Sequence, residues 1–161
     1  SKETRKAVTS GKPCDCGQRT CPVCMLFGAH KPPTECDPQL GPTRLLVRDA
    51  CLTREYDEMF RNGRLPMEIK NENIINRVTG EAKHPRPLER VPAGVRFGLN
   101  MALKVYEDDD PKLPDWIFKG LRLVEMDALG GCSSRGCGQV TFEGLTLNGA
   151  PVDLSTFSVF D

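Results

Sequence analysis

The sequence EIKNENIINRVTGEAKHPRPLERVPAGVRF, residues 68–97, decides how this chain is interpreted. It is too polar to form a core and too long for an ordinary turn. Loops longer than about 12–15 residues without a core of their own are usually functional or disordered. Its mixed charge predicts a projecting arm over residues 64–94 that contacts an anionic partner, and a solvated mobile loop is the alternative. The basic candidates for this contact are Lys70, Arg77, Lys83, His84, Arg86 and Arg90.

Two strands are predicted around the arm. The alternation of apolar and polar residues over 95–105 predicts a strand with one buried and one solvated face. Residues 43–52, TRLLVRDACL, carry apolar residues on both faces, which predicts a strand buried on both sides. Asp49 is the exception. Burying an unpaired charge is unfavourable, so a carboxylate in a buried strand is expected to be paired or to have a function. A structural bond to a backbone group or an arginine is one interpretation of Asp49, and catalysis is the other.

The composition sets limits on the whole chain. Its 161 residues suit one domain, and the first residue is Ser1, which fits a processed product or a segment of a longer protein. The 22 basic and 22 acidic residues give no net charge, so any nucleic-acid partner must be bound by local patches. No run of residues approaches the ~18 apolar residues of a membrane span, and no apolar signal region opens the chain.

The cysteines indicate a metal site. Eight cysteines without an export signal favour metal binding or free thiols over a disulfide framework. Residues 13–28, PCDCGQRTCPVCMLFG, contain two closely spaced cysteine pairs that can fill the tetrahedral shell of a structural zinc ion. Redox-active or disulfide-bonded cysteines are the alternative, and His30 or Cys36 could replace a ligand. The predicted ligands are Cys14, Cys16, Cys21 and Cys24.

Helices are predicted on either side of the strand that follows the arm. A short helix over 56–63 is ended by Gly63, and residues 107–110 are predicted to form an acidic, solvated turn. A second helix over 116–129 is ended by Gly130. Its apolar stripe at helical spacing, which is predicted to face the core, consists of Ile117, Leu121, Val124 and Ala128.

A glycine-rich segment, residues 130–138, GGCSSRGCG, separates this helix from a predicted strand over 139–147. Backbone amides in such a run can approach an anion, and Arg135 can bind a phosphate with its forked guanidinium group. The order of helix, glycines and strand differs from a P-loop and from a dinucleotide-binding fingerprint. A flexible connection without a ligand is the alternative.

Three stretches together resemble a known family. MEIKNENIINRVTGEAKHPRPLERVPAGVRF, GLRLVEMDALGGCSSRGCGQVTFEGL and TRLLVRDACL are similar to the RAMP-superfamily backbone subunit of type III-A (Csm) CRISPR effector complexes. The resemblance runs from about residue 14 to residue 147. Zinc knuckles similar to residues 14–24 occur in some members, including the repeated domains of the single-chain type III-E effectors.

The resemblance implies an α+β, ferredoxin-like (RRM-like) RAMP domain with a zinc knuckle and a thumb. The arm would be the thumb hairpin that presses between guide and target RNA. The glycine-rich loop would line the guide backbone, although Cys132 and Cys137 stand where the family more often has a serine and an aromatic residue. The RNA contacts implied for this loop come from Gly131, Ser133, Ser134 and Arg135.

Nothing before Cys14 matches the strand, the aspartate-bearing loop and the basic helix that open the family's domain. The prediction is therefore one partial RAMP domain over residues 1–161, completed by another piece of the same polypeptide or by a separate chain. The implied function is a guide-RNA-binding module of a cytoplasmic, prokaryotic effector that cleaves complementary target RNA. Its implied partners are guide RNA, target RNA and other RAMP subunits.

Cleavage would need Mg²⁺ or another divalent ion and an aspartate outside this chain, with Asp49 as a candidate supporting carboxylate and Zn²⁺ in a structural role. The chain by itself is expected to be inactive. One alternative is a non-catalytic, zinc-stabilised RNA-binding or assembly module. Another is a thiol oxidoreductase that uses Cys21 and Cys24, which would need a thiol pair free of metal.

Overall fold

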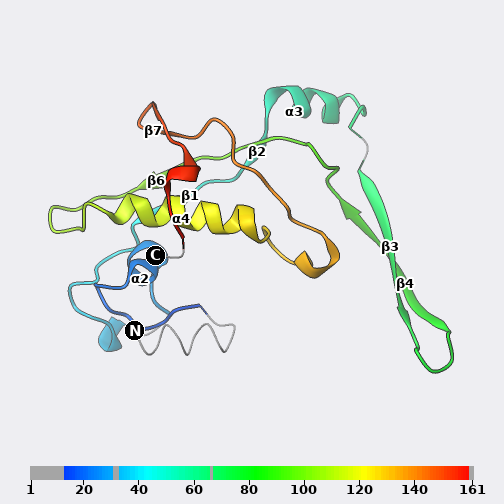
Figure 1. Ribbon diagram of the computed structural model, residues 1–161, viewed down its shortest axis with the longest axis horizontal. Helices are drawn as coiled ribbons and strands as arrows, with labels where there is room; N and C mark the ends of the chain where they lie inside the picture. Colours follow the sequence, from blue (N-terminus) through cyan, green and yellow to red (C-terminus); the bar gives the residue numbers. More distant parts are fainter. Residues whose placement is uncertain (1–12, 31–32, 66, 160–161) are drawn as a thin grey trace. The chain divides into compact units, whose positions relative to one another are not determined.

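A computed structural model describes residues 13–30, 33–65 and 67–159 of the chain. The chain has mixed α/β structure and separates into two units, Ser1–Leu46 with Leu103–Asp161 and Val47–Ala102. Figure 1 shows its helices and its short, two-stranded sheets. Among the described residues, no helix has the length and apolar character that crossing a membrane requires.

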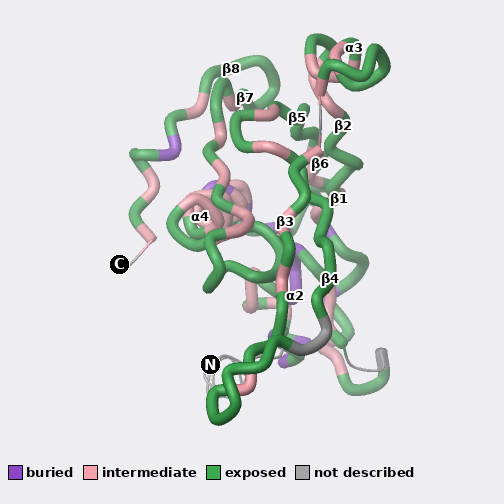
Figure 2. Tube along the Cα trace, turned by 90° about the vertical axis from the view of Figure 1, so that its right-hand side faces the viewer, coloured by how far each residue is buried: buried purple, intermediate pink, exposed green. Residues whose placement is uncertain are grey.

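The core of the first unit is built around the cysteine segment. The buried side chains of Met25 and Leu26 come from α2 (Pro22–Phe27), a short helix that begins directly after Cys21. They pack in one cluster with Leu40, Leu113 and three of the cysteines. Figure 2 marks the few buried positions of the described chain, which include residues of α2 and α4. The predicted zinc knuckle is therefore part of the core and not an appendage to it.

Helix α4 (Leu113–Met126) is the longest helix described. It begins earlier than predicted because Pro114 lies in its first turn, where a missing N–H costs nothing. It ends at Met126 because Asp127 leaves the helical conformation, so the end predicted at residue 129 is wrong. Its buried residues are Leu113 and Phe118, and the predicted stripe is only half-buried. Phe118 packs against Phe157, with ring centroids 5.0 Å apart, next to the 3-10 turn η3 (Leu154–Thr156).

Two further elements of this unit follow α4. The 3-10 turn η2 (Ser133–Arg135) lies within the glycine-rich segment. The predicted strand over 139–147 is wrong except at its end, where β7 (Thr146–Leu147) pairs with β8 (Ala150–Pro151). Asn148 and Gly149 both have positive φ angles, 51° and 85°, and such a pair forms the tight turn of a two-residue hairpin.

The strands flanking the arm are shorter than predicted. Residues 43–52 give β1 (Leu45–Val47) and β2 (Cys51–Leu52), and residues 95–106 give β5 (Phe97–Gly98) and β6 (Met101–Leu103). β1 pairs with β6 and β2 pairs with β5. The expected burial of 43–52 on both sides is wrong: Leu45 packs against the core cluster, whereas Val47, Asp49 and Cys51 are exposed.

The second unit contains helix α3 (Arg54–Arg61) and the arm. Gly63 follows α3 with a φ of 66°, as expected for a helix terminator. The arm is a β-hairpin of β3 (Glu68–Ile75) and β4 (Ala82–Arg90), paired in antiparallel register with a bulge between Glu72 and Ile74. It is a long two-stranded ribbon in Figure 1, and most of its described side chains are exposed.

Candidate metal centre and RNA-binding surface

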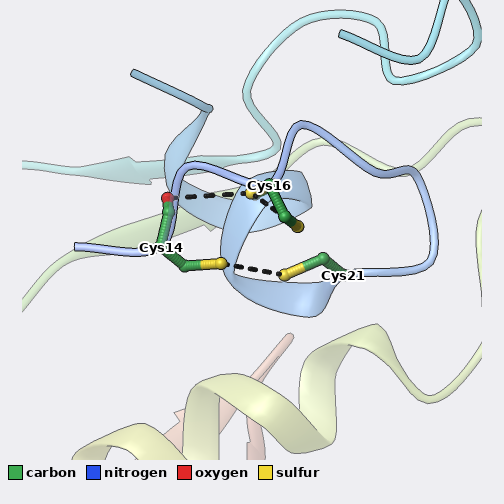
Figure 3. Close-up of side chains that lie close together, drawn as sticks. Cys14, Cys16 and Cys21 are labelled. Atoms are coloured by element: carbon green, nitrogen blue, oxygen red, sulfur yellow. Dashed lines mark hydrogen bonds between the residues drawn. The ribbon is translucent and has the colours of Figure 1, made fainter. Parts of the chain in front are cut away.

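Four cysteine sulfurs lie together in the first unit. Each residue offers one ligand atom, and these atoms all lie within 4.8 Å of one another. Figure 3 shows the side chains of Cys14 and Cys21 pointing toward one another. Their sulfur atoms are 3.7 Å apart, and those of Cys16 and Cys24 are 3.6 Å apart. Four thiolates at about 2.3 Å from a central zinc ion would have sulfurs about 3.8 Å apart. The cluster therefore has the spacing that a tetrahedral metal site requires, and it could hold a metal ion such as zinc.

The surroundings of the cluster argue against redox chemistry. Burial raises the pKa of the Cys24 thiol to about 12 and also raises the pKa of Cys16. Thiols with raised pKa values stay protonated at neutral pH, whereas reactive cysteines have lowered ones. The four cysteines are free thiols in this structure, and no disulfide joins them. A metal ion would displace the protons, because cysteine binds metals as a thiolate.

The local backbone brings the two cysteine pairs together. Gly17, directly after Cys16, has a φ of 66°, and a side chain there would press on Cys36 at 3.0 Å from its sulfur. Cys21 lies at the start of α2 and Cys24 lies inside it, which places these two sulfurs on one helical turn. Within the described residues the metal-binding group consists of the four predicted cysteines and does not include His30 or Cys36.

The basic residues of the hairpin are distributed between its strands and its tip. Cross-strand ion pairs join Arg86 to Glu72 at 3.3 Å and Arg90 to Glu68 at 2.7 Å, so part of the predicted positive charge is balanced. Lys70 is half-buried on β3, whereas Arg77 is exposed in the turn that joins the strands. The side chains of Lys83 and His84 lie outside the described parts of the structure.

The hairpin tip also carries an apolar residue that the sequence interpretation did not single out. Val78 is 94% exposed in the turn, where Asn76 accepts a hydrogen bond from the Val78 backbone N–H at 2.9 Å. A single exposed valine is ordinary on a protein surface, so its exposure does not by itself indicate a partner. In the sequence, Val78 could have been noticed as a lone apolar residue between Arg77 and Thr79 in an otherwise polar turn.

The glycine-rich loop is a turn whose serines and arginine face solvent. Ser133, Ser134 and Arg135 form η2 and are exposed. A Cβ at Gly131 would meet no atom within 4 Å, which leaves that backbone open to a ligand. Gly138 has another role, because a Cβ there would lie 2.2 Å from the Leu129 carbonyl oxygen. Glycine at position 138 therefore permits the loop to close on itself.

Two carboxylates differ from their sequence interpretation. Asp49 is exposed between β1 and β2, so the argument for its function from burial in a strand is wrong. Asp109 was assigned to a solvated turn, yet its side chain is fully buried against Arg44. The Arg44 guanidinium group holds the pKa of Asp109 below its usual range. No short-range pattern reveals this pair, because its members are 65 residues apart.

The chain is similar in sequence to several proteins that share one name. The chain is 37% identical over 160 residues to the CRISPR system Cms endoribonuclease Csm3 of Methanothermobacter thermautotrophicus, and this match covers 91% of the chain and 62% of the relative. The protein of the same name from Methanocaldococcus jannaschii is 35% identical over 137 residues, covering 84% of the chain and 52% of the relative. The Mycobacterium tuberculosis protein of that name is 37% identical over 121 residues, covering 66% and 51%.

No protein-family model matches the chain. The chain spans about half to three fifths of the length of these relatives. The resemblance to the RAMP-superfamily backbone subunit of type III-A (Csm) complexes is confirmed by the names that these relatives share. We conclude that the chain is similar to Csm3 proteins of CRISPR systems over most of its own length.

Proposed function

We propose that the chain is a guide-RNA-binding backbone module of a type III CRISPR effector that cleaves complementary target RNA. The observation that carries this proposal is the similarity to Csm3 endoribonucleases along 91% of the chain. The same similarity supports a partial, ferredoxin-like RAMP domain with a zinc knuckle at residues 13–28, a thumb at 64–94 and a guide-binding loop at 130–138. The mixed α/β structure is compatible with this assignment.

The hairpin would act as the thumb. Its cross-strand ion pairs stiffen the strands, while Arg77 and Val78 project the charge and apolar surface of the tip into solvent. An arginine next to an apolar side chain suits the edge of an RNA duplex, where a phosphate and a base face lie close together. Lys70, Lys83, His84, Arg86 and Arg90 would supply further backbone contacts along the ribbon.

The glycine-rich loop would contact the phosphates of the guide. Ser133, Ser134 and Arg135 are exposed donors on one short turn, and the Gly131 backbone is open beside them. Contacts of this kind position an RNA strand without reading its sequence. That property is required of a subunit that must accept any guide.

Two kinds of metal would serve this function. Zn²⁺ would be held by Cys14, Cys16, Cys21 and Cys24, and with four sulfurs around it the ion would stabilise the fold without an open position for catalysis. Mg²⁺ or another divalent ion would neutralise the charge on the target phosphate during cleavage. The main catalytic aspartate would come from outside this chain, with Asp49 as a supporting carboxylate.

The partners would be guide RNA, target RNA, other RAMP subunits and the piece that completes this domain. The buried apolar residues that the structure describes are few and all lie in the first unit, which supports completion of this domain by further protein. The expected setting, the prokaryotic cytoplasm, stays a prediction.

A non-catalytic RNA-binding or assembly module is the second candidate, favoured by the exposed position of Asp49. The two functions are separated by assembling the chain with the remaining subunits of its effector and a guide, and then adding labelled complementary RNA. The proposed function is supported if the complementary RNA is cleaved in Mg²⁺, if EDTA abolishes this cleavage, and if a non-complementary RNA stays intact. Guide and target binding without cleavage would leave only the scaffolding role.

A further inference from the structure

Arg19 connects the metal-binding loop to the rest of the first unit. It lies between Cys16 and Cys21, in the loop that joins the two cysteine pairs. Its guanidinium group donates to the carbonyl oxygens of Gln39 at 2.7 Å and Asp108 at 2.6 Å. The same group lies 3.7 Å from an Asp109 carboxylate oxygen. One side chain of the loop thus reaches two segments that are distant in sequence.

Asp109 is a buried anchor for this arginine. Its side chain has no exposed surface and accepts two hydrogen bonds from Arg44, each 3.0 Å long. It accepts a third from the Tyr106 backbone N–H at 3.0 Å. The Arg44 guanidinium group also lies over the Tyr106 ring, 4.7 Å from its centroid. The carboxylate is therefore held rigidly, and Arg19 contacts a fixed point.

We propose that Arg19, acting through Asp109, is a positioning residue of the four-cysteine metal site. A metal ion would fix the loop at both ends, through Cys16 and Cys21, and this is the loop conformation in which Arg19 reaches Asp109. Two interactions that stabilise one conformation must strengthen each other equally. Metal binding is thereby coupled to the stability of the turn over residues 106–110, in which the Tyr106 backbone N–H donates to Asp109. This inference rests on the zinc site of the proposed function.

The test measures zinc release from the zinc-loaded full chain into an excess of a chromogenic chelator. Arg19→Ala is expected to release zinc about tenfold faster than the parent, within the 5–150-fold range of typical couplings. Arg19→Lys should be intermediate, because it keeps the charge but loses the fork that reaches two carbonyl groups. Arg54→Ala is the matched control, since Arg54 is also paired with a carboxylate but its side chain is 94% exposed in the other unit.

Two further measurements separate positioning from general destabilisation. Phe157→Leu weakens the packing on Phe118 and should lower the unfolding midpoint while zinc release stays at the parental rate. In Arg19→Ala, hydrogen exchange of the Tyr106 amide should become faster well below the unfolding midpoint. Asp109→Asn should reproduce the faster release if it folds.

The possible failures are distinguishable. Parental release rates in both Arg19 variants, with zinc bound at normal stoichiometry, would overturn the coupling and leave the zinc site intact. Faster release in Phe157→Leu to the same extent as in Arg19→Ala would also overturn it, because stability alone would then explain the effect. A parent chain that binds no zinc would remove the zinc site of the proposed function and this inference with it.

Discussion

At the scale of single residues, the four clustered cysteines point to one kind of chemistry, the binding of a metal ion. Their sequence spacing predicted which four cysteines the structure brings together, because the two pairs lie within eleven residues of one another. Asp49 and Asp109 show where such reasoning ends. Whether a carboxylate is buried depends on segments far away in the chain, so the solvated role of Asp109 and the buried position of Asp49 were both predicted wrongly.

The first prediction concerns the metal ligands. Purified parent protein should contain close to one zinc ion per chain, and Cys21→Ser should lose it, because three sulfurs and a hydroxyl hold zinc less tightly. Binding free energies of structural zinc in small peptides are about 10–16 kcal/mol, so the loss should lower stability by several kcal/mol. Elemental analysis gives the stoichiometry. Full zinc content in Cys21→Ser would show that this sulfur is not a ligand.

The second prediction concerns pH and Glu125. Glu125 accepts a hydrogen bond from the Phe142 backbone N–H at 2.7 Å and pairs with Arg122, and these contacts lower its pKa. A carboxylate with a lowered pKa in the folded state contributes stability above its unfolded pKa of about 4.3 and loses it as the pH falls further. Glu125→Gln should therefore be about 1 kcal/mol less stable than the parent at pH 7.

This difference should shrink as the pH falls below about 4, because protonated glutamic acid and glutamine are then equivalent acceptors. Chemical denaturation of both proteins across the pH range measures it. The comparison with the parent cancels the contribution of Asp153, whose pKa is also lowered, by the Ser155 backbone N–H. A difference in unfolding free energy that is independent of pH would contradict the assignment.

At the scale of elements, the hairpin was predicted better than the strands beside it. The long polar stretch predicted a projecting arm, the family resemblance implied a hairpin, and the structure forms one over β3 and β4. The strands β1, β2, β5 and β6 were predicted as two continuous elements. Their alternating pattern is correct for a sheet, but continuous pairing depends on neighbouring strands, which the pattern does not reveal.

The third prediction concerns the hairpin. Replacing residues 72–86 with a short Gly-Ser turn keeps four cross-strand pairs at the hairpin base and removes the tip with Arg77 and Val78. Guide RNA should stay bound, whereas the positions at which target RNA is cut should lose their order. Val78→Ser is the milder variant and should show part of the effect. Denaturing gels of cleaved target report this, and an unchanged cleavage pattern in both variants would show that the hairpin has no role in cleavage.

The fourth prediction separates two glycines of one loop. Gly131→Ala should leave the thermal midpoint unchanged, because its new methyl group meets no protein atom within 4 Å, and should weaken guide binding if RNA lies there. Gly138→Ala should lower the midpoint, since its methyl group would overlap the Leu129 carbonyl oxygen. Thermal unfolding and guide-binding titrations on the same samples distinguish these effects. Normal guide affinity in Gly131→Ala would place the guide elsewhere.

Arg135 provides the fifth prediction. A hydrogen bond to a charged group contributes about 1.5–3 kcal/mol, so Arg135→Ala should weaken guide binding by roughly one to two orders of magnitude. The loss should be similar for unrelated guides, and the salt dependence of binding should flatten by about one charge. A salt titration with two guides of equal length measures both. If guide binding by Arg135→Ala depended on salt as steeply as that of the parent, the loop would only connect the segments before and after it.

At the scale of the whole molecule, the core formed by the described residues lies in the first unit. Its buried apolar residues are few, and they gather around the cysteine cluster. The sequence indicated a modest core through its 6% aromatic content, but the arrangement of that core around the metal site required the structure. The resemblance to Csm3 was visible in three stretches of sequence, and it agrees with relatives that are longer than this chain.

The central claim is that this module binds guide RNA, and the identity of the RNA that it holds in cells tests the claim most directly. The chain should be purified, with the proteins that associate with it, from cells that carry a CRISPR array, and the bound RNA should be sequenced. We expect guides of many different spacer sequences joined to one common repeat-derived part. In the combined Gly131→Ala and Arg135→Ala variant, the amount of each guide should fall to a similar extent. Recovery of cellular RNA without enrichment of guides would contradict the account.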